Sequence, residues 1–181
     1  MISNLIDRYL GRTGVAGSAP QASISVLTTA AYTAGAVLNE GGQILTLSAV
    51  AHGKGDIVRL ESIHVWEVTS TGAAITPGIR FYVMNKTYAP PVQNSPFLGP
   101  SANAKAIVGI FDVASTDYVT YSDGTLNRAV AHVAASAASV DGGVDMRTAT
   151  DDTNLYVVAA TTGAPTFAAD ASLHFEFIFS T

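Results

Sequence analysis

The stretch Ser172–Ser180, SLHFEFIFS, decides the fold because its side chains alternate between two chemical kinds. A leucine and three phenylalanines occupy the odd positions, whereas His174, Glu176 and Ser180 occupy even ones, with Ile178 as the exception. A period of two places the two kinds on opposite faces of a strand. The stretch therefore predicts a central β-strand whose aromatic side chains lie in the core.

The same period recurs along most of the chain, between clusters of Gly, Pro, Asn and Asp. Further strands are predicted from Ala22 onward and at Gln43–Ala49, Ile57–Val68, Gly78–Asn85, Lys105–Val113 and Asn154–Ala160. The alternation within Ile57–Val68 slips near Ser62, which indicates a β-bulge or a strand buried on both faces. Ala129–Ala138 fits a short helix or a weak strand. The prediction for residues 21–181 is an all-β domain, an antiparallel β-sandwich or jelly roll.

The first ten residues have a helical period instead. Their apolar side chains fall on one stripe of a helix and are Ile2, Leu5, Ile6, Tyr9 and Leu10. A segment rich in Gly, Ser and Ala follows, up to Pro20, and is typical of a flexible linker. Residues 1–20 are therefore predicted to be an amphipathic helical arm, and its stripe supplies candidate partner contacts. The arm docks on its own domain, on another subunit or on a shell, or it is disordered.

A second candidate contact region is the proline-rich stretch Thr87–Pro100. Four prolines within it disfavour regular strand pairing and predict a long surface loop. Long ordered loops more often carry function than packing. Its aromatic residues, Tyr88 and Phe97, are the candidate partner contacts here.

Composition limits the class of partner. Charged residues make up only 13% of the chain, which favours a surface largely covered by other subunits. A net charge of -5 without a Lys/Arg cluster argues against nucleic acid. The chain has no apolar run of membrane-spanning length and no signal-peptide pattern, so neither membrane insertion nor export by that route is expected. The absence of cysteine is compatible with assembly in a reducing cytoplasm.

No catalytic or metal-binding motif is visible in the sequence. The four histidines stand far apart, without a ligand-like spacing. Asp141, Asp145, Asp151 and Asp152 are near one another and could hold a hard cation, although a solvated acidic turn is the interpretation we favour. We expect no cofactor, no metal and no enzymatic activity. A β-sandwich glycan hydrolase that uses two distant carboxylates is the alternative in the enzyme class.

Several motifs, in this order, resemble a family of small virion proteins of tailed bacteriophages. They are Tyr32–Leu38 (YTAGAVL), Ile79–Asn85 (IRFYVMN), Lys105–Ile110 (KAIVGI) and the tail Asn154–Leu173, which contains the turn Gly163–Phe167 (GAPTF). The resemblance extends from Tyr32 to the C-terminus. It implies a fold and supplies no reactive group.

The resemblance implies a capsid decoration or cement protein, often a homotrimer, located on the capsid surface of the virion. Its partner would be the major capsid protein, whose lattice it stabilises after assembly in the bacterial host cytoplasm. The alternative is a head-fibre or tail-tip module that binds a host receptor or glycan, with the proline-rich loop as its binding platform.

Overall fold

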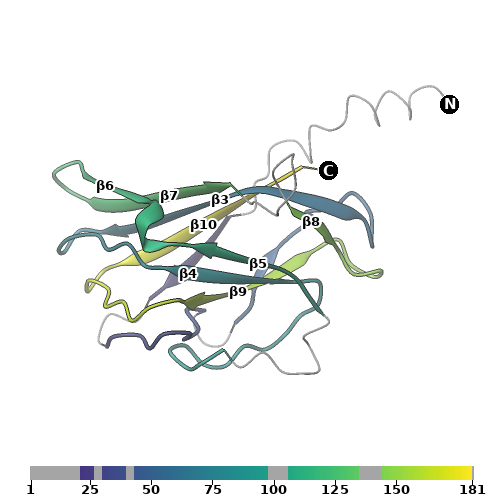
Figure 1. Ribbon diagram of the computed structural model, residues 1–181, viewed down its shortest axis with the longest axis horizontal. Helices are drawn as coiled ribbons and strands as arrows, with labels where there is room; N and C mark the ends of the chain where they lie inside the picture. Colours follow the sequence, from purple (N-terminus) through teal and green to yellow (C-terminus); the bar gives the residue numbers. More distant parts are fainter. Residues whose placement is uncertain (1–20, 27–29, 40–42, 98–105, 135–143, 181) are drawn as a thin grey trace.

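The protein is an antiparallel β-sandwich made of two sheets (Figure 1). The computed structural model describes residues 21–26, 30–39, 43–97, 106–134 and 144–180. The elements in chain order are β1 (Gln21–Ser25), β2 (Leu45–Leu47), β3 (Ile57–Thr69), β4 (Ile79–Met84), β5 (Ile107–Val113), the 3-10 turn η3 (Ser115–Asp117), β6 (Tyr118–Ser122), β7 (Asn127–Ala134), β8 (Val144–Arg147), β9 (Leu155–Thr161) and β10 (Ser172–Ser180). The predicted all-β sandwich is confirmed.

The larger sheet has six strands in the order β1-β10-β3-β7-β6, and β8 pairs with β3 beyond the end of β7. The smaller sheet has four strands in the order β2-β9-β4-β5. Strand β10 lies between β1 and β3, so its predicted central position is confirmed. Figure 1 shows the two sheets as stacked layers that face each other.

Aromatic side chains fill the space between the sheets. Phe175 and Phe177 point inward from β10, and both meet Phe81 of β4 edge to face, with ring centroids 5.1 and 5.5 Å apart. All three are fully buried. At another place in the core, Tyr32 meets Phe167 edge to face at 5.6 Å. The alternation in the last strand therefore builds the centre of the core.

The predicted slip in β3 is a β-bulge. Ile178 pairs with Ser62, whereas its neighbour Phe179 pairs with Leu60, which leaves Glu61 without a cross-strand residue. The extra residue reverses the inward parity of β3, so that Leu60 and Ile63 both face the core.

Two strands were not predicted, and one ambiguous segment is resolved. The ambiguous segment that begins at Ala129 belongs to a strand and not to a helix, since β7 covers Asn127–Ala134. Strand β6 was missed because it is an edge strand whose residues are mostly exposed. It has Thr and Ser at the positions where apolar side chains would have revealed the alternation. Strand β8 has only four residues, too few to show a period.

A short ladder completes the free side of β9. The amides of Gly35 and Leu38 donate to β9, and the carbonyl of Ala36 accepts from the Thr161 N–H. Gly35 has φ of 80°, a conformation that favours glycine, so the tight turn entering this ladder needs this residue. The ladder belongs to the YTAGAVL segment, and the Tyr32 N–H donates to Pro165 in the GAPTF turn at 2.9 Å. Two motifs far apart in sequence are thus packed together.

Asn39 continues this ladder with its side chain. Its Nδ2 donates to the Val157 carbonyl at 3.2 Å, and its Oδ1 accepts from the Ala159 N–H at 2.8 Å. The residue is fully buried. Its amide therefore stands in for a strand backbone between the segment that ends at Leu38 and strand β2, and it satisfies two buried groups of β9.

The described residues include no α-helix, and the predicted helical arm over residues 1–20 lies outside them. In the part of the chain that the structure describes, no helix has the length and apolar character required to cross a membrane.

Candidate functional site

The two aromatic residues predicted from the proline-rich loop come together on the outer face of the four-stranded sheet. The rings of Tyr88 and Phe97 meet edge to face, with centroids 6.1 Å apart. Phe97 also lies 4.4 Å from Tyr82, which points outward from β4. We call these three partly exposed side chains the aromatic shelf.

The loop that carries the shelf is packed down and does not project freely. The Phe97 N–H donates to Gly35 at 3.0 Å, and the Val37 N–H donates to Ser95 at 2.9 Å. Beneath the shelf is a second apolar cluster, separate from the main core, whose buried members are Val37, Met84, Tyr156 and Val158. As predicted, the loop contains no regular strand from Thr87 to Phe97; it makes a single bridge, between Ala36 and Pro96. Residues 98–100 lie outside the described residues.

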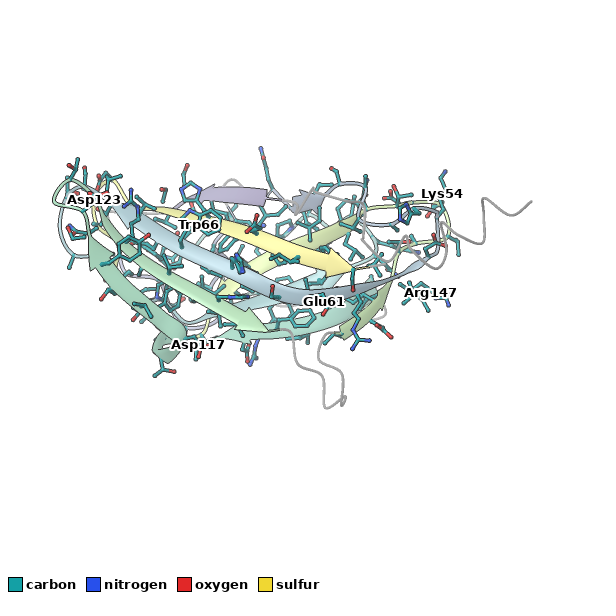
Figure 2. All side chains as sticks on the ribbon, turned by 90° about the horizontal axis from the view of Figure 1, so that it is seen from above. Lys54, Glu61, Trp66, Asp117, Asp123 and Arg147 are labelled. Atoms are coloured by element: carbon teal, nitrogen blue, oxygen red, sulfur yellow. The ribbon has the colours of Figure 1, made fainter. Side chains whose placement is uncertain are left out.

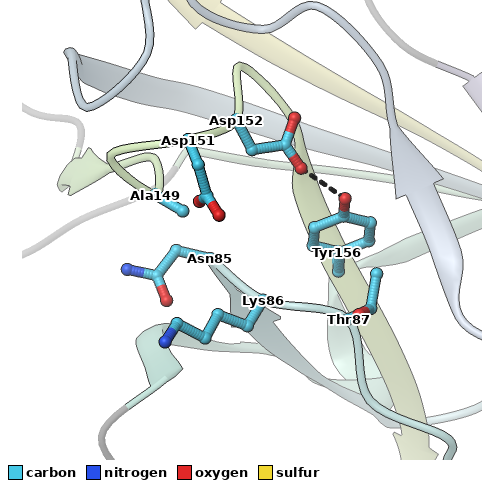
Figure 3. A pocket seen from close by; sticks show the side chains of 7 residues that line it. All are labelled: Asn85, Lys86, Thr87, Ala149, Asp151, Asp152 and Tyr156. Atoms are coloured by element: carbon cyan, nitrogen blue, oxygen red, sulfur yellow. Dashed lines mark hydrogen bonds between the residues drawn. The ribbon is translucent and has the colours of Figure 1, made fainter.

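A cavity of about 330 Å³ opens at the end of this sheet, where β4 finishes and β9 begins (Figure 3). It is lined by Asn85, Lys86, Thr87, Ala149, Asp151, Asp152 and Tyr156. Tyr156 also belongs to the apolar cluster beneath the shelf. The cavity and the aromatic shelf therefore share one supporting side chain.

One side of this cavity is held by an ordered carboxylate. Asp152 accepts hydrogen bonds from the Tyr156 hydroxyl and from the N–H groups of Thr153 and Asn154. The Tyr156 hydroxyl is the main cause that lowers the pKa of Asp152, and the two backbone donors lower it further. Asp152 is therefore ionised at neutral pH and fixes the 151–154 turn.

The outer face of the six-stranded sheet is a second candidate surface. One row crosses four strands and consists of Val119, Val130, Trp66 and His174. The next row contains Tyr121, Arg128 and Val68. Val119 is 70% exposed and Tyr121 50% exposed. Figure 2 looks onto this face, with Trp66 and Glu61 over the sheet and Asp123, Lys54 and Arg147 toward its two ends. We call the seven residues of the two rows the apolar face.

Three histidines that are distant in sequence lie on this same face. The rings of His64 and His132 meet at 4.1 Å, and His174 stacks on Trp66 at 5.7 Å with an interplanar angle of 11°. His64 Nδ1 is 3.0 Å from a carboxylate oxygen of Glu176. Burial lowers the pKa of His174. Spacing along the sequence did not indicate this grouping, because cross-strand register creates it.

The core contains an unusual acid, Glu67, which is fully buried on β3. Neither of its carboxylate oxygens has a hydrogen-bond partner among the described residues, and the same holds for the buried hydroxyl of Tyr118. Burial raises the pKa of Glu67 to about 7, and Asp170 adds to this effect. The Ile75 backbone lies close enough to oppose the shift but does not reach hydrogen-bond geometry. Burial is also the main cause that raises the pKa of Tyr118.

The acidic turn considered as a cation site is only partly described. Asp145, Asp151 and Asp152 are described, whereas Asp141 lies outside the described residues. Across the described ranges, no three or more His, Cys, Asp or Glu side chains are grouped so that they could hold a metal ion.

The candidate contacts of the predicted arm also lie outside the described residues, and they are Ile2, Leu5, Ile6, Tyr9 and Leu10. Comparison with known proteins finds no family model and no curated sequence that matches the chain.

Proposed function

We propose that the chain is a structural protein of a tailed bacteriophage virion, a decoration subunit that binds the outer surface of the capsid and stabilises the lattice of the major capsid protein. The proposal includes a homotrimeric jelly-roll subunit, with residues 1–20 as an additional docking arm and no catalytic role. The observation that carries it is the apolar face, combined with the resemblance of the YTAGAVL and GAPTF motifs to phage virion proteins.

The apolar face suits a protein partner. A sheet that faces water normally carries polar side chains on its outer side. Here Val119, Val130 and Trp66 form one continuous row instead. In the next row the guanidinium carbon of Arg128 lies over the Tyr121 ring, 5.7 Å from its centroid. Aromatic residues and arginine are enriched where proteins bind one another. The low charge of the whole chain agrees with a subunit that is partly covered in the particle.

The copy number of the chain in purified virions tests this role. A decoration subunit is expected at a ratio near one to the major capsid protein, because it repeats with the lattice. Quantitative mass spectrometry of the particles measures this ratio. A handful of copies per particle would contradict the proposal and favour a head-fibre or tail-tip module. Complete absence from the particle would also contradict it and favour the enzyme alternative.

We expect the apolar face to be the surface that meets the shell. Val119→Lys is expected to reduce capsid occupancy strongly, because it places a charge within the apolar contact, while leaving the folded protein stable, since this side chain is 70% exposed. Val92→Lys is the matched control, a valine that is 67% exposed on the proline-rich loop. Occupancy is measured by cosedimentation of purified protein with undecorated capsids. Equal occupancy of the two variants would show that the apolar face is not the contact.

A host-binding or glycan-binding module is the second candidate function, and the aromatic shelf favours it. Tyr82, Tyr88 and Phe97 are partly exposed aromatic side chains on a packed and therefore pre-ordered support. This surface is on the opposite sheet from the apolar face, so both surfaces can be used by one subunit.

A further inference from the structure

The cavity beside the aromatic shelf is built from three separate parts of the chain. Asn85, Lys86 and Thr87 follow β4, Asp151 comes from the turn before β9, and Tyr156 comes from β9 itself. Figure 3 shows the Asp151 side chain pointing toward those of Asn85 and Lys86, with Asp152 hydrogen-bonded to Tyr156 to the right of them. The register of β4 with β9, in which Met84 pairs with Tyr156, brings these parts together.

The lining offers donors and acceptors that the described protein does not use. Neither the Asn85 amide, the Lys86 ammonium nor the Asp151 carboxylate makes a hydrogen bond or ion pair with another described residue. An ammonium donates, a carboxylate accepts and an amide does both. A ligand that satisfies all three must itself both donate and accept at several neighbouring atoms.

The charge balance of the cavity disfavours an ionic ligand. Asp151 and Asp152 supply two negative charges, Lys86 supplies a positive one, and Lys54 lies near enough to Asp152 to help lower its pKa. With the charges nearly balanced, neither an anion such as phosphate nor a cation is selected. A volume of about 330 Å³ corresponds to the lower end of small-molecule pockets.

We infer that this cavity binds a sugar residue of a glycan, with Asp151 and Asn85 bonded to neighbouring hydroxyls and Lys86 donating to another. Each sugar hydroxyl is both donor and acceptor, which matches the mixed lining. The apolar ring face of the next sugar residue would lie on Tyr88 and Phe97 of the aromatic shelf. The inference rests on the second candidate function and is independent of the capsid contact.

The supporting structure favours such a ligand because the binding groups start from an ordered frame. Asp152 holds the turn next to Asp151 through Tyr156 and two backbone N–H groups. The apolar cluster beneath the aromatic shelf holds Tyr156 and Tyr88. Ordering the site before binding lowers the entropic cost of capturing a weak ligand.

The test is a titration of the full chain with sugars, in which binding is measured by saturation-transfer NMR. The sugars are glucose, galactose, mannose, N-acetylglucosamine and N-acetylgalactosamine, and short oligosaccharides of each. At least one sugar is expected to bind saturably. Asp151→Ala is expected to weaken its binding at least about tenfold, since a hydrogen bond to a charged group is lost. Asp145→Ala is the control, because it removes an exposed carboxylate from β8, outside the cavity, and its binding should equal that of the wild type.

Tyr88→Ala separates the two parts of the site. It is expected to weaken oligosaccharide binding and to leave monosaccharide binding nearly unchanged, because the aromatic shelf contacts only the second sugar residue. Inorganic phosphate is included as an anionic probe. The inference is overturned if no sugar binds saturably, if phosphate binds more tightly than every sugar, or if Asp151→Ala binds like the wild type. Adhesion of the labelled chain to host cells is measured in parallel, so that a host-binding role through some other ligand is recognised separately.

Discussion

Replacing Phe81 with alanine is expected to lower the free energy of unfolding by about 3–5 kcal/mol. Phe81 is fully buried and meets both Phe175 and Phe177 edge to face. The substitution removes the transfer energy of a large aromatic side chain and opens a cavity between the sheets that two rigid rings cannot fill.

Urea unfolding at neutral pH, followed by tryptophan fluorescence, measures this loss. Ile110→Ala is the matched control, because Ile110 lies on the neighbouring strand β5, pairs with Tyr82 and is 55% exposed. A surface position of this kind is expected to cost well under about 1 kcal/mol. If Phe81→Ala cost no more than the control, the three rings would not form the centre of the core.

Replacing Glu67 with glutamine is expected to stabilise the protein at pH 8 by about 3 kcal/mol and to change little at pH 4. The pKa of Glu67 is about 7 in the folded protein against an ordinary value of 4.5, and each pH unit between them corresponds to about 1.4 kcal/mol. The unfolded chain therefore releases this proton first, and the folded state is progressively disfavoured as pH rises from about 4.5 to about 7. Above that window the cost is constant.

The measurement is the free energy of unfolding of both proteins from pH 4 to pH 8. The wild type is expected to lose stability relative to Glu67→Gln as pH rises through this window. Glu61→Gln serves as the control, since Glu61 is on the same strand with a side chain that is 40% exposed, and it should follow the wild type. Parallel curves for the wild type and Glu67→Gln would show that Glu67 is not held as a neutral acid.

The sandwich could be predicted from the sequence because its inner strands alternate strongly. The period of SLHFEFIFS placed β10 in the centre of a sheet. The parity slip near Ser62 predicted a bulge or a strand buried on both faces, and the structure shows the bulge at Glu61. Strands β6 and β8 could not be predicted, because an exposed edge strand and a four-residue strand bury too few side chains to show a period. The order of the strands within each sheet could not be predicted either, because strand pairing depends on contacts between distant parts of the chain.

The surfaces were only partly predictable. Tyr88 and Phe97 were predicted from the composition of their loop, but their partner Tyr82 was not, because it belongs to a strand and not to the loop. The apolar face was missed because Val119, Val130 and Trp66 are far apart in sequence and are aligned only by cross-strand register. The burial of Glu67 was also missed: it shares the inward parity of Ile63 and Val65 on β3, but a carboxylate at such a position is normally exposed to water.

The short ladder beside β9 affects whether another chain can pair with this edge of the smaller sheet. On the far side of Ala36 the next residue in register is Pro96, which has no N–H to offer a further strand. Pro90 and Pro91 lie in the same loop. A free strand edge recruits other chains and seeds fibres, and the hazard grows when many copies are held at high local concentration. The proline at this position therefore disfavours the pairing of a further chain on this side of the smaller sheet.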